Sequence, residues 1–508
     1  MRILIVGAGP SGLFLACKLM QFNLQPVLID RLPSPSDLPK AVGISNASLS
    51  LLGSLGLKQA ILEEASLADG IDMYWHGKHT NRVTMKYLKI PSPHKFIFLN
   101  QVAMERLLRN HLERMGGKIL RNTECVSMRD GDEVVVTLKT MEGLEKRTFD
   151  WVAACDGASS SMRTMMKAEL ERDDYGAYFV LLDAYCSGLS QKQVGYYLSN
   201  DGYLMLVPLE PGQYRIIASF TGSMPSEPIP TNEAKAFFSE IVRSRARFNI
   251  EFEKLVWFTA GPLRHQYVTD PIRGKCIFVG DAFHTFSPVG GTTMNMAFQD
   301  VNNLAWKLAY SAKGVAKNTL CIDSYRAERL NATRQLIDLS TIATHAITQV
   351  KEQSPFTKNS FETSFSNRAW LYRGLPEIFS GYAQNYGATA SDLFYQGEGN
   401  LSGKFIGNIA DWVSIKKVDS LAHYLLFFCE EEMDEGLCDD IDLPNWIVKM
   451  SFTKEHFPGT LIEFLSAAIN NIRELFYILV RPDGYIAVSG KREEMLPLAS
   501  YLEKIKSE

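Results

Sequence analysis

The first thirty residues contain the pattern that most restricts what this chain can fold into. Ile3–Val6 is a continuous apolar run, residues 7–12 have the sequence GAGPSG, and a second apolar run, Pro26–Ile29, ends at Asp30. Short apolar runs of this kind are typical of strands buried on both faces of a parallel sheet. The glycines predict a tight turn into a helix, which we expect to end near Gln21. The sequence therefore predicts a β-α-β unit at the N-terminus.

The three glycines of this unit have separate physical roles. Gly7 allows the tight turn, Gly9 lets the backbone approach a pyrophosphate, and Gly12 lets the helix pack against the strand. Asp30 lies 18 positions after Gly12, close to the ~20 expected for a carboxylate that binds a ribose 2′-hydroxyl. The spacing predicts a dinucleotide site, and it does not distinguish NAD from FAD.

Two further motifs follow apolar runs later in the chain. The dipeptide Asp156-Gly157 comes shortly after Trp151–Ala154, and the dipeptide Gly280-Asp281 follows Cys276–Val279. Asp-Gly is common in type I and type II turns. In isolation, each dipeptide therefore predicts only a turn after a buried strand.

The third motif continues beyond Asp281. The segment Ser287-Pro288-Val289-Gly290-Gly291 predicts a turn, and an amphipathic stretch extends from Thr292 to Tyr310. Such a turn lets the backbone N–H groups at a helix N-terminus approach an electron-rich ring or a phosphate. Three motifs in this order favour a binding site over three unrelated turns.

The bulk properties limit the class of protein. A chain of 508 residues is too long for one hydrophobic core and predicts two or three domains. The formal net charge of −4 gives no reason to expect nucleic acid or an anionic membrane as a partner. The N-terminal apolar run is too short for a signal peptide, and no apolar run reaches the ~20 residues that span a bilayer. We therefore expect no stable membrane association.

Cysteine and histidine usage adds two expectations. The eight cysteines are scattered, with no Cys-x-x-Cys pair, which is typical of small buried residues in a reducing compartment and predicts a cytoplasmic protein. His76 and His79 lie three positions apart without a third candidate ligand nearby in sequence, so we expect no metal. His284 is expected to be a structural hydrogen-bonding residue rather than an acid or a base.

Other segments predict the surrounding elements. Asn100 is a good N-cap for a helix from Gln101 to Met115, which Gly116-Gly117 would end. Short, half-alternating runs between residues 180 and 220 predict an antiparallel sheet inserted into the nucleotide-binding domain. Near the C-terminus, apolar runs at 424–428, 476–480 and 485–488 predict buried strands, the last two joined by a turn with the sequence RPDG.

Together these motifs resemble the flavoprotein aromatic hydroxylases, the group A FAD-dependent monooxygenases of the phenol and polyketide hydroxylase type. The C-terminal sequence RPDGYIA, residues 481–487, looks like the signature that closes the thioredoxin-like domain of this group. The resemblance implies an α/β fold with a Rossmann-like FAD-binding domain (1–170 and 272–394), an inserted antiparallel-sheet substrate domain (171–271) and a C-terminal thioredoxin-like α/β domain (395–508). That last domain has Cys429 and Cys438 but no redox pair, so we expect no thiol–disulfide chemistry.

The resemblance also implies which residues hold FAD. Asp281 would bind the ribityl chain, Gln101 would lie near it, and the Asp156-Gly157 loop would serve both FAD and the docking of NADPH. The flavin-facing loop Pro288, Gly290 and Gly291 would lie against the reacting ring, and no catalytic acid or base is identified. The expected cofactor-binding residues are Gly7, Gly9, Pro10, Ser11, Gly12, Asp30, Arg31, Lys40, Gln101, Asp156, Gly157, Gly280, Asp281, Pro288, Gly291, Thr293, Met294 and Asn295.

Some positions match this family in a structural role and others depart from it. Tyr325, Glu328 and Arg329 match a Tyr-x-x-Glu-Arg pattern that we take as structural. The family usually has glycine where this chain has Thr293 and Ala297, and arginine where it has Lys40. A β-branched residue would be strained at a site that needs a positive φ. We therefore expect the flavin-facing loop to differ locally, with Thr292 or Thr293 capping the following helix.

The implied reaction uses NADPH, with NADH as the alternative, to reduce FAD. Reduced FAD would take up O₂, and a flavin C4a-hydroperoxide would transfer one oxygen atom to a small phenolic or polyketide-like aromatic substrate. Baeyer–Villiger insertion, epoxidation or plain reduction on the same fold remains open, as does a non-catalytic flavin-binding interaction protein. The sequence is compatible with a monomer or a homodimer.

Overall fold

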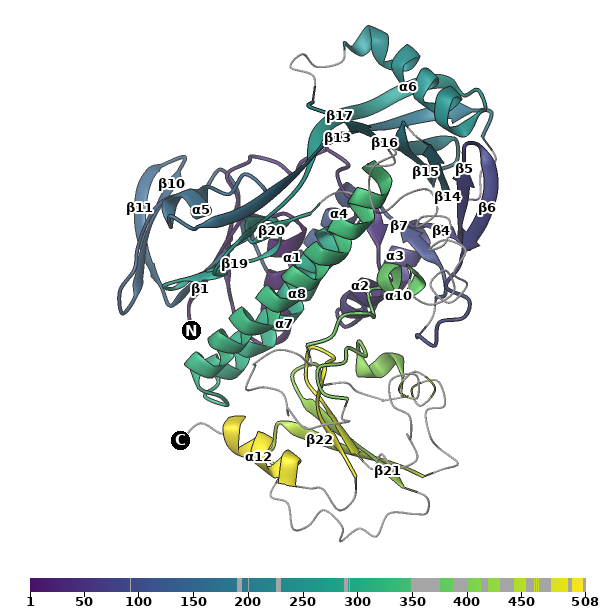
Figure 1. The fold of residues 1–508 in the computed structure, drawn as a ribbon. Coiled ribbons are helices and arrows are strands. Elements are labelled where there is room, and N and C mark those ends of the chain that lie inside the picture. Colours follow the sequence, from purple (N-terminus) through teal and green to yellow (C-terminus); the bar gives the residue numbers. More distant parts are fainter. Residues whose placement is uncertain are drawn as a thin grey trace.

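The computed structural model describes most of the chain, and its strands fall into five sheets within the described residues (Figure 1). The described residues are 1–91, 93–189, 194–199, 201–224, 230–286, 291, 293–348, 375–386, 401–412, 419–429, 443–453, 461, 463, 465, 477–491 and 496–505. The expectation for Cys438 falls outside them.

A six-stranded sheet forms the centre of the molecule and contains the predicted N-terminal β-α-β unit. Its strand order is β18-β19-β12-β1-β2-β8, and all neighbours are parallel except β18 and β19. The strands are β1 (Ile3–Val6), β2 (Val27–Ile29), β8 (Ile119–Leu120), β12 (Trp151–Ala154), β18 (Ile272–Arg273) and β19 (Cys276–Phe278). Strands from the N-terminus and from the middle of the chain therefore share one sheet.

Both faces of this sheet are covered, as its continuous apolar strands predict. Ile3 and Ile5 join the core that contains α1 (Pro10–Gln21), α4 (Gln101–Arg114) and α7 (Thr293–Ala312). Leu4 and Val6 join a second core on the other face. That core includes a three-stranded antiparallel sheet made of β9 (Glu124–Arg129), β10 (Val134–Thr140) and β11 (Gly143–Phe149).

An eight-stranded sheet forms the upper lobe in Figure 1 and confirms the predicted antiparallel strands. Its order is β20-β17-β13-β16-β15-β14-β5-β6. The strands are β5 (Ile71–Trp75), β6 (Lys78–Val83), β13 (Leu170–Ser187), β14 (Val194–Ser199), β15 (Gly202–Glu210), β16 (Gln213–Thr221), β17 (Glu251–Val268) and β20 (His284–Thr285). Helix α6 (Thr231–Ala246) packs on one face through Phe238, Ile241 and Val242.

Two features of this sheet differ from the apolar pattern. β13 begins at Leu170, ten residues before the predicted strand, because its exposed first half is held by pairing with β17 rather than by hydrophobic burial. β5 and β6 were not predicted, and they extend the sheet from within the N-terminal segment by parallel pairing of β5 with β14.

The C-terminal lobe contains the predicted apolar strands in a four-stranded sheet of order β22-β21-β23-β24. β21 (His423–Cys429) is parallel to β22 (Ile447–Thr453), whereas β23 (Tyr477–Val480) and β24 (Ile486–Gly490) are antiparallel to their neighbours. Helix α12 (Leu496–Ile505) follows the last strand. The thioredoxin-like description of this lobe stays a prediction.

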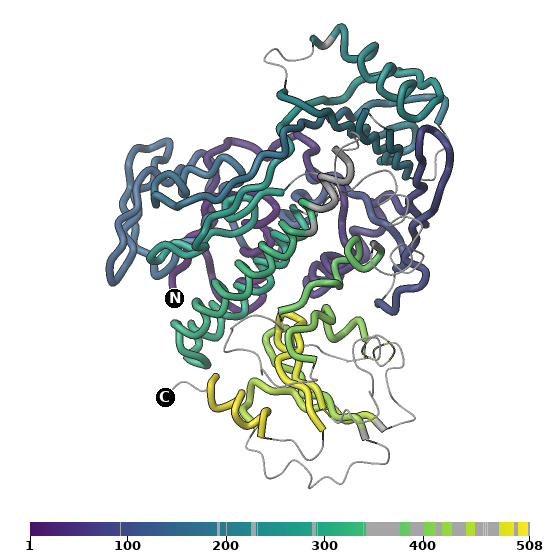
Figure 2. The backbone as a smooth tube through the Cα atoms, in the orientation of Figure 1, coloured from purple at the N-terminus to yellow at the C-terminus, as the bar shows by residue number. Residues whose placement is uncertain are grey.

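The 31-residue helix α8 (Asn318–Thr348) passes along α7 and reaches β13, β15 and β16 of the eight-stranded sheet (Figure 2). None of the helices in the described ranges is long and apolar enough to cross a membrane. The remaining elements are β3 (Gly43–Ile44), α2 (Asn46–Gly53), α3 (Lys58–Glu64), β4 (Ser66–Ala68), β7 (Phe96–Phe98), α5 (Ser161–Met165), η1 (Gly280–Ala282), α10 (Leu375–Ser380) and η3 (Ile409–Asp411).

Candidate functional site

The three sequence motifs meet at one edge of the six-stranded sheet. β1, β12 and β19 are parallel neighbours, so the loops that follow them lie side by side. The backbone N–H of Cys155 donates to the carbonyl of Val6 (2.8 Å), and that of Val279 donates to the carbonyl of Ala154 (3.0 Å). In parallel α/β sheets, ligands bind outside the carboxyl ends of the strands. The fold therefore brings the predicted residues together where such a ligand would lie.

The glycine loop has the packing that its three predicted roles require. Gly7 has a φ of +104°, and a Cβ there would come within 3.0 Å of the Cys155 carbonyl. A Cβ on Gly12 would overlap the carbonyl oxygen of Gly7, whereas a Cβ on Gly9 would meet no atom within 4 Å. Pro10 begins α1 without a side-chain cap before it. The loop is closed at Gly7 and Gly12 and open at Gly9, beside the first N–H groups of α1, which have no partner within the helix and suit a pyrophosphate.

Asp30 fixes this loop from the end of β2. Its Oδ2 accepts from the backbone N–H of Ala8 (2.9 Å), its Oδ1 accepts from that of Leu32 (2.8 Å), and Arg121 lies 3.4 Å from Oδ2. Arg31, the next residue, is exposed. The carboxylate lies at the predicted place next to the glycine loop, and its contact with a ribose stays a prediction.

Asp281 has the least satisfied carboxylate of the site. Burial raises the pKa of Asp281, and His284, Lys40 and Arg163 offset that rise only in part. Asp281 is only partly exposed, and none of the described residues donates a hydrogen bond to its side chain, which leaves its acceptor oxygens available. Hydroxyl groups of a bound ligand would donate to them. This is the observation that best fits the ribityl chain of FAD.

Gly280 places Asp281 in this position. It has a φ of +60°, which suits glycine, and a Cβ there would come within 3.0 Å of Ser11 Oγ. The Gly280 turn therefore packs against the first turn of α1. Arg163 adds a further link, because its Nη1 donates to the carbonyls of Asp281 (2.9 Å) and Ala282 (3.1 Å). No role was predicted for Arg163, which lies six positions after Gly157.

The carboxylate of Asp156 is used within its own loop. It accepts from Ser160 Oγ (2.6 Å), from Ser161 Oγ (3.2 Å) and from the backbone N–H of Met162 (3.0 Å), which ties it to the N-terminus of α5. Gly157 follows with a φ of +82°. The pair is thus more than an isolated turn, and its contacts with FAD and NADPH stay predictions.

Gln101 and Lys40 approach the site from the neighbouring segments. Asn100 caps α4 as predicted, by accepting from the N–H of Ala103 (2.9 Å). Gln101 is then the first residue of α4, and its Nε2 donates to Glu105 (2.8 Å). Lys40 is exposed, and Arg215 of the upper sheet donates to its carbonyl.

The start of α7 leaves Thr292 as the remaining candidate of the two expected caps. α7 begins at Thr293, whose backbone is helical, so this threonine is neither strained by a positive φ nor in the cap position. Thr292, the other candidate cap, lies outside the described residues, as do Pro288 and Gly290. Gly291 is described and has a φ of +62°.

The first turn of α7 is tied to the N-terminal segment. Asn295 Nδ2 donates to the carbonyls of Gly291 (2.9 Å) and Gly43 (3.0 Å), and its Oδ1 accepts from the N–H of Ser45 (2.9 Å). Met294 is buried. Asn295 therefore links Gly291 and the first turn of α7 to β3 and to the start of α2.

The Tyr-x-x-Glu-Arg pattern has the expected structural role. Tyr325 donates to the carbonyl of Phe278 (2.9 Å). Fully buried Glu328 accepts from Lys307 (2.8 Å) and, in bidentate form, from Arg481 (2.9 Å for each oxygen). Arg481 belongs to the RPDG turn, so this network joins the C-terminal lobe to α7 and α8.

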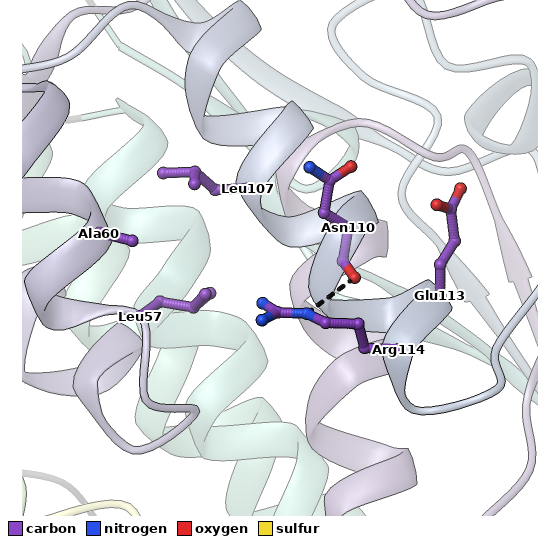
Figure 3. A pocket seen from close by; sticks show the side chains of 6 residues that line it. All are labelled: Leu57, Ala60, Leu107, Asn110, Glu113 and Arg114. Carbon is purple, nitrogen blue, oxygen red and sulfur yellow. Dashed lines mark hydrogen bonds between the residues drawn. The ribbon is translucent and has the colours of Figure 1, made fainter.

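A cavity of about 660 Å³ lies between α3 and α4 (Figure 3), away from the motifs. It is lined by Leu57, Ala60, Leu107, Asn110, Glu113 and Arg114. Arg114 Nε donates to the carbonyl of Asn110 (3.3 Å) within its own helix. Because the cavity contains none of the motif residues, it is not part of the candidate site. Within the described residues, no group of three or more His, Cys, Asp or Glu side chains could hold a metal ion.

Fold and site together define a dinucleotide-binding α/β protein with an inserted antiparallel sheet. The sequence model of the family described as "FAD binding domain" matches residues 1–340. The chain therefore belongs to this family, and FAD is its cofactor. The resemblance to flavoprotein aromatic hydroxylases is confirmed, as is the fold class.

Two curated relatives and one solved structure illustrate this likeness. 6-Methylpretetramide 4-monooxygenase of Streptomyces rimosus is 29% identical over 349 residues, 68% of this chain and 61% of that protein. Pentachlorophenol 4-monooxygenase of Sphingobium chlorophenolicum is 27% identical over 360 residues, 68% of this chain and 64% of that protein. The match thus spans less than two thirds of either relative. The solved structure of anhydrotetracycline hydroxylase from Streptomyces rimosus aligns over 99% of each chain, with a TM-score of 0.79 and 23% identity.

Proposed function

We propose that the protein is an FAD-dependent monooxygenase that uses NADPH and O₂ to hydroxylate an aromatic, phenolic or polyketide-like substrate. The observation that carries the proposal is the junction, at one sheet edge, of an open Gly9 loop and the carboxylate of Asp281, to which no residue in the described ranges donates a hydrogen bond. The names of the relatives, which act on a chlorinated phenol and a pretetramide, favour this reaction class.

When bound, FAD supplies the redox chemistry, because the isoalloxazine accepts hydride from a nicotinamide and reacts with O₂. The residues of this chain bind and orient it. In the proposed site, the first N–H groups of α1 would bind the pyrophosphate. Asp30 would bind the adenosine ribose, and Asp281 would bind the ribityl hydroxyls. Lys40 would supply the positive charge that arginine supplies in the family, as a point charge rather than a bidentate group.

We place the aromatic substrate against the inner face of the eight-stranded sheet. α6 covers the other face, whereas Phe179, Tyr196 and Trp257 are partly buried and pack towards the core shared with α1 and α7. Tyr196 stacks on Tyr203 with ring centroids 5.5 Å apart. Flat apolar rings of this kind suit an aromatic ligand, because offset stacking adds ~0.5–1.5 kcal/mol to area burial.

The remaining expectations stay parts of this proposal. The domain limits are 1–170 with 272–394, 171–271, and 395–508, with β5 and β6 adding to the edge of the inserted sheet. A cytoplasmic location is favoured by six cysteines that are free and buried: Cys17, Cys125, Cys155, Cys186, Cys276 and Cys321. Either a monomer or a homodimer accommodates the proposed site, whose residues all come from one chain.

The test is a screen of phenols and aromatic polyketides with the FAD-loaded full chain. A true substrate should accelerate NADPH oxidation and lower the amount of H₂O₂ formed per NADPH. A ring-expanded or epoxide product would instead identify one of the alternative reactions. Bound FAD that neither NADPH nor NADH reduces, with or without substrates, would contradict the proposal and favour a non-catalytic flavin-binding protein.

A further inference from the structure

A buried carboxylate on α7 holds the Gly280-Asp281 turn from behind. Asp300 is completely buried, and its Oδ2 accepts from the backbone N–H of Gly280 (2.9 Å) and from His284 Nε2 (2.8 Å). Its Oδ1 accepts from Arg329 Nε (2.7 Å) on α8. Asp300 thus links the turn before Asp281 to two helices and to the strand after it.

The chemistry of this cluster requires an ionised carboxylate. All three partners of Asp300 are N–H donors, and a carboxylate offers acceptors on both oxygens. Burial alone would raise the pKa of Asp300, but His284 and Arg329 outweigh burial and hold that pKa below its ordinary value. An asparagine would turn an NH₂ group towards at least one N–H donor. Position 300 therefore favours aspartate over asparagine, although the two side chains have nearly the same shape.

The consequence for the site follows from the conformation of Gly280. Its φ of +60° is held by the bond from its N–H to Asp300 and by close packing against Ser11. Asp281 has no donor of its own among the described residues, so the direction of its carboxylate depends on this turn. His284 Nδ1 is likewise buried without a partner in the described part of the chain, which leaves Asp300 as the group that orients the imidazole.

We propose that Asp300 is a positioning residue for FAD, which acts through Gly280 and His284 to keep the Asp281 carboxylate directed at the ribityl chain. The inference rests on the FAD site described above and not on the hydroxylation reaction. Asp300 itself need not touch FAD.

The test compares FAD binding with folding in matched variants of the full chain. Asp300→Asn should raise the dissociation constant of FAD about 10- to 100-fold, the effect of one lost charge-assisted hydrogen bond. Glu328→Gln is the control, because Glu328 is an equally buried, ion-paired carboxylate whose partners include Lys307, Arg481 and Asn303, all outside the Gly280-Asp281 turn. Flavin fluorescence titration gives the dissociation constant, and thermal unfolding of the apoprotein gives the stability.

The apoprotein of both variants should unfold at a lower temperature than the wild type, and only Asp300→Asn should weaken the binding of FAD. If Asp300→Asn does not fold, His284→Phe keeps a ring of similar size, removes one donor from Asp300 and should weaken FAD by about threefold to tenfold. Equal losses of FAD affinity in Asp300→Asn and Glu328→Gln would overturn the proposal, as would wild-type affinity in His284→Phe. Because neither readout involves turnover, failure of the proposed reaction would leave this result interpretable.

Discussion

Two glycines of the N-terminal loop, three positions apart, should respond to alanine in opposite ways. A Cβ on Gly12 would lie 1.9 Å from the carbonyl oxygen of Gly7, against 3.4–4 Å for an ordinary contact. Relief would require α1 to move away from the turn that follows β1. Overpacking of this kind costs about 1–3 kcal/mol or more, so Gly12→Ala should clearly lower the unfolding temperature of the apoprotein.

Gly9→Ala should leave the apoprotein intact and damage the site. The added Cβ meets no atom within 4 Å, and the backbone (φ −77°, ψ −171°) is one that alanine adopts freely. The apoprotein should be unchanged or stabilised by up to ~1 kcal/mol, because alanine reduces the entropy of the unfolded chain. The methyl group would occupy the space through which the backbone approaches the pyrophosphate. A loss of about 2.8 kcal/mol there corresponds to a 100-fold weaker complex.

The assay is the same for both variants: thermal unfolding of the apoprotein and titration with FAD. Gly9→Ala should leave the unfolding temperature of the apoprotein normal and weaken the binding of FAD. Gly12→Ala should lower the unfolding temperature of the apoprotein. Normal FAD affinity in Gly9→Ala would refute the placement of the pyrophosphate. Wild-type stability in Gly12→Ala would refute the packing of α1 against the loop.

Two further variants test individual side chains. Asp281→Ala should weaken the binding of FAD by about 1.5–3 kcal/mol. It should not destabilise the apoprotein, since burial raises the pKa of Asp281 and no described residue donates a hydrogen bond to its carboxylate. Protein that remains fully yellow after gel filtration would contradict this role. Burial lowers the pKa of Lys18 to about 7, despite the nearby charge of Asp483. Between that value and 10.5 the unfolded chain binds the proton that the folded chain has lost, so the free energy of unfolding should rise with pH by up to about 1.4 kcal/mol per unit. At pH 7 the Lys18→Met variant should be more stable than the wild-type protein, and its free energy of unfolding should no longer rise with pH above 7. The same pH profile in both proteins would show that Lys18 stays charged.

The sequence predicted those parts of the fold whose signal is local. β1, β2, β12 and β19 are short apolar runs, and the first glycines after β1, β12 and β19 (Gly7, Gly157 and Gly280) have a positive φ that alanine would disturb. The polar first half of β13 gave no such signal, because that half is stabilised by its pairing with β17.

In the candidate site, too, some features follow from a local sequence pattern and others are visible only in the structure. The position of Asp281 follows from its motif, whereas the anchor formed by Asp300 and Arg329 joins residues 29 positions apart on two helices. No spacing rule within one helix or strand reveals such a pair. Thr293 replaces a glycine of the family, and the structure places it in the first turn of a helix, where no positive φ is needed.

The central claim is that this chain transfers one oxygen atom from O₂ to an aromatic ring at the expense of NADPH. The most direct measurement is the mass of the product formed under ¹⁸O₂ by the FAD-loaded full chain, NADPH and an active aromatic substrate. We predict one ¹⁸O atom per product molecule and no label from H₂¹⁸O. Conversion that continues at the same rate after O₂ is removed, or a product without the label, would contradict the claim.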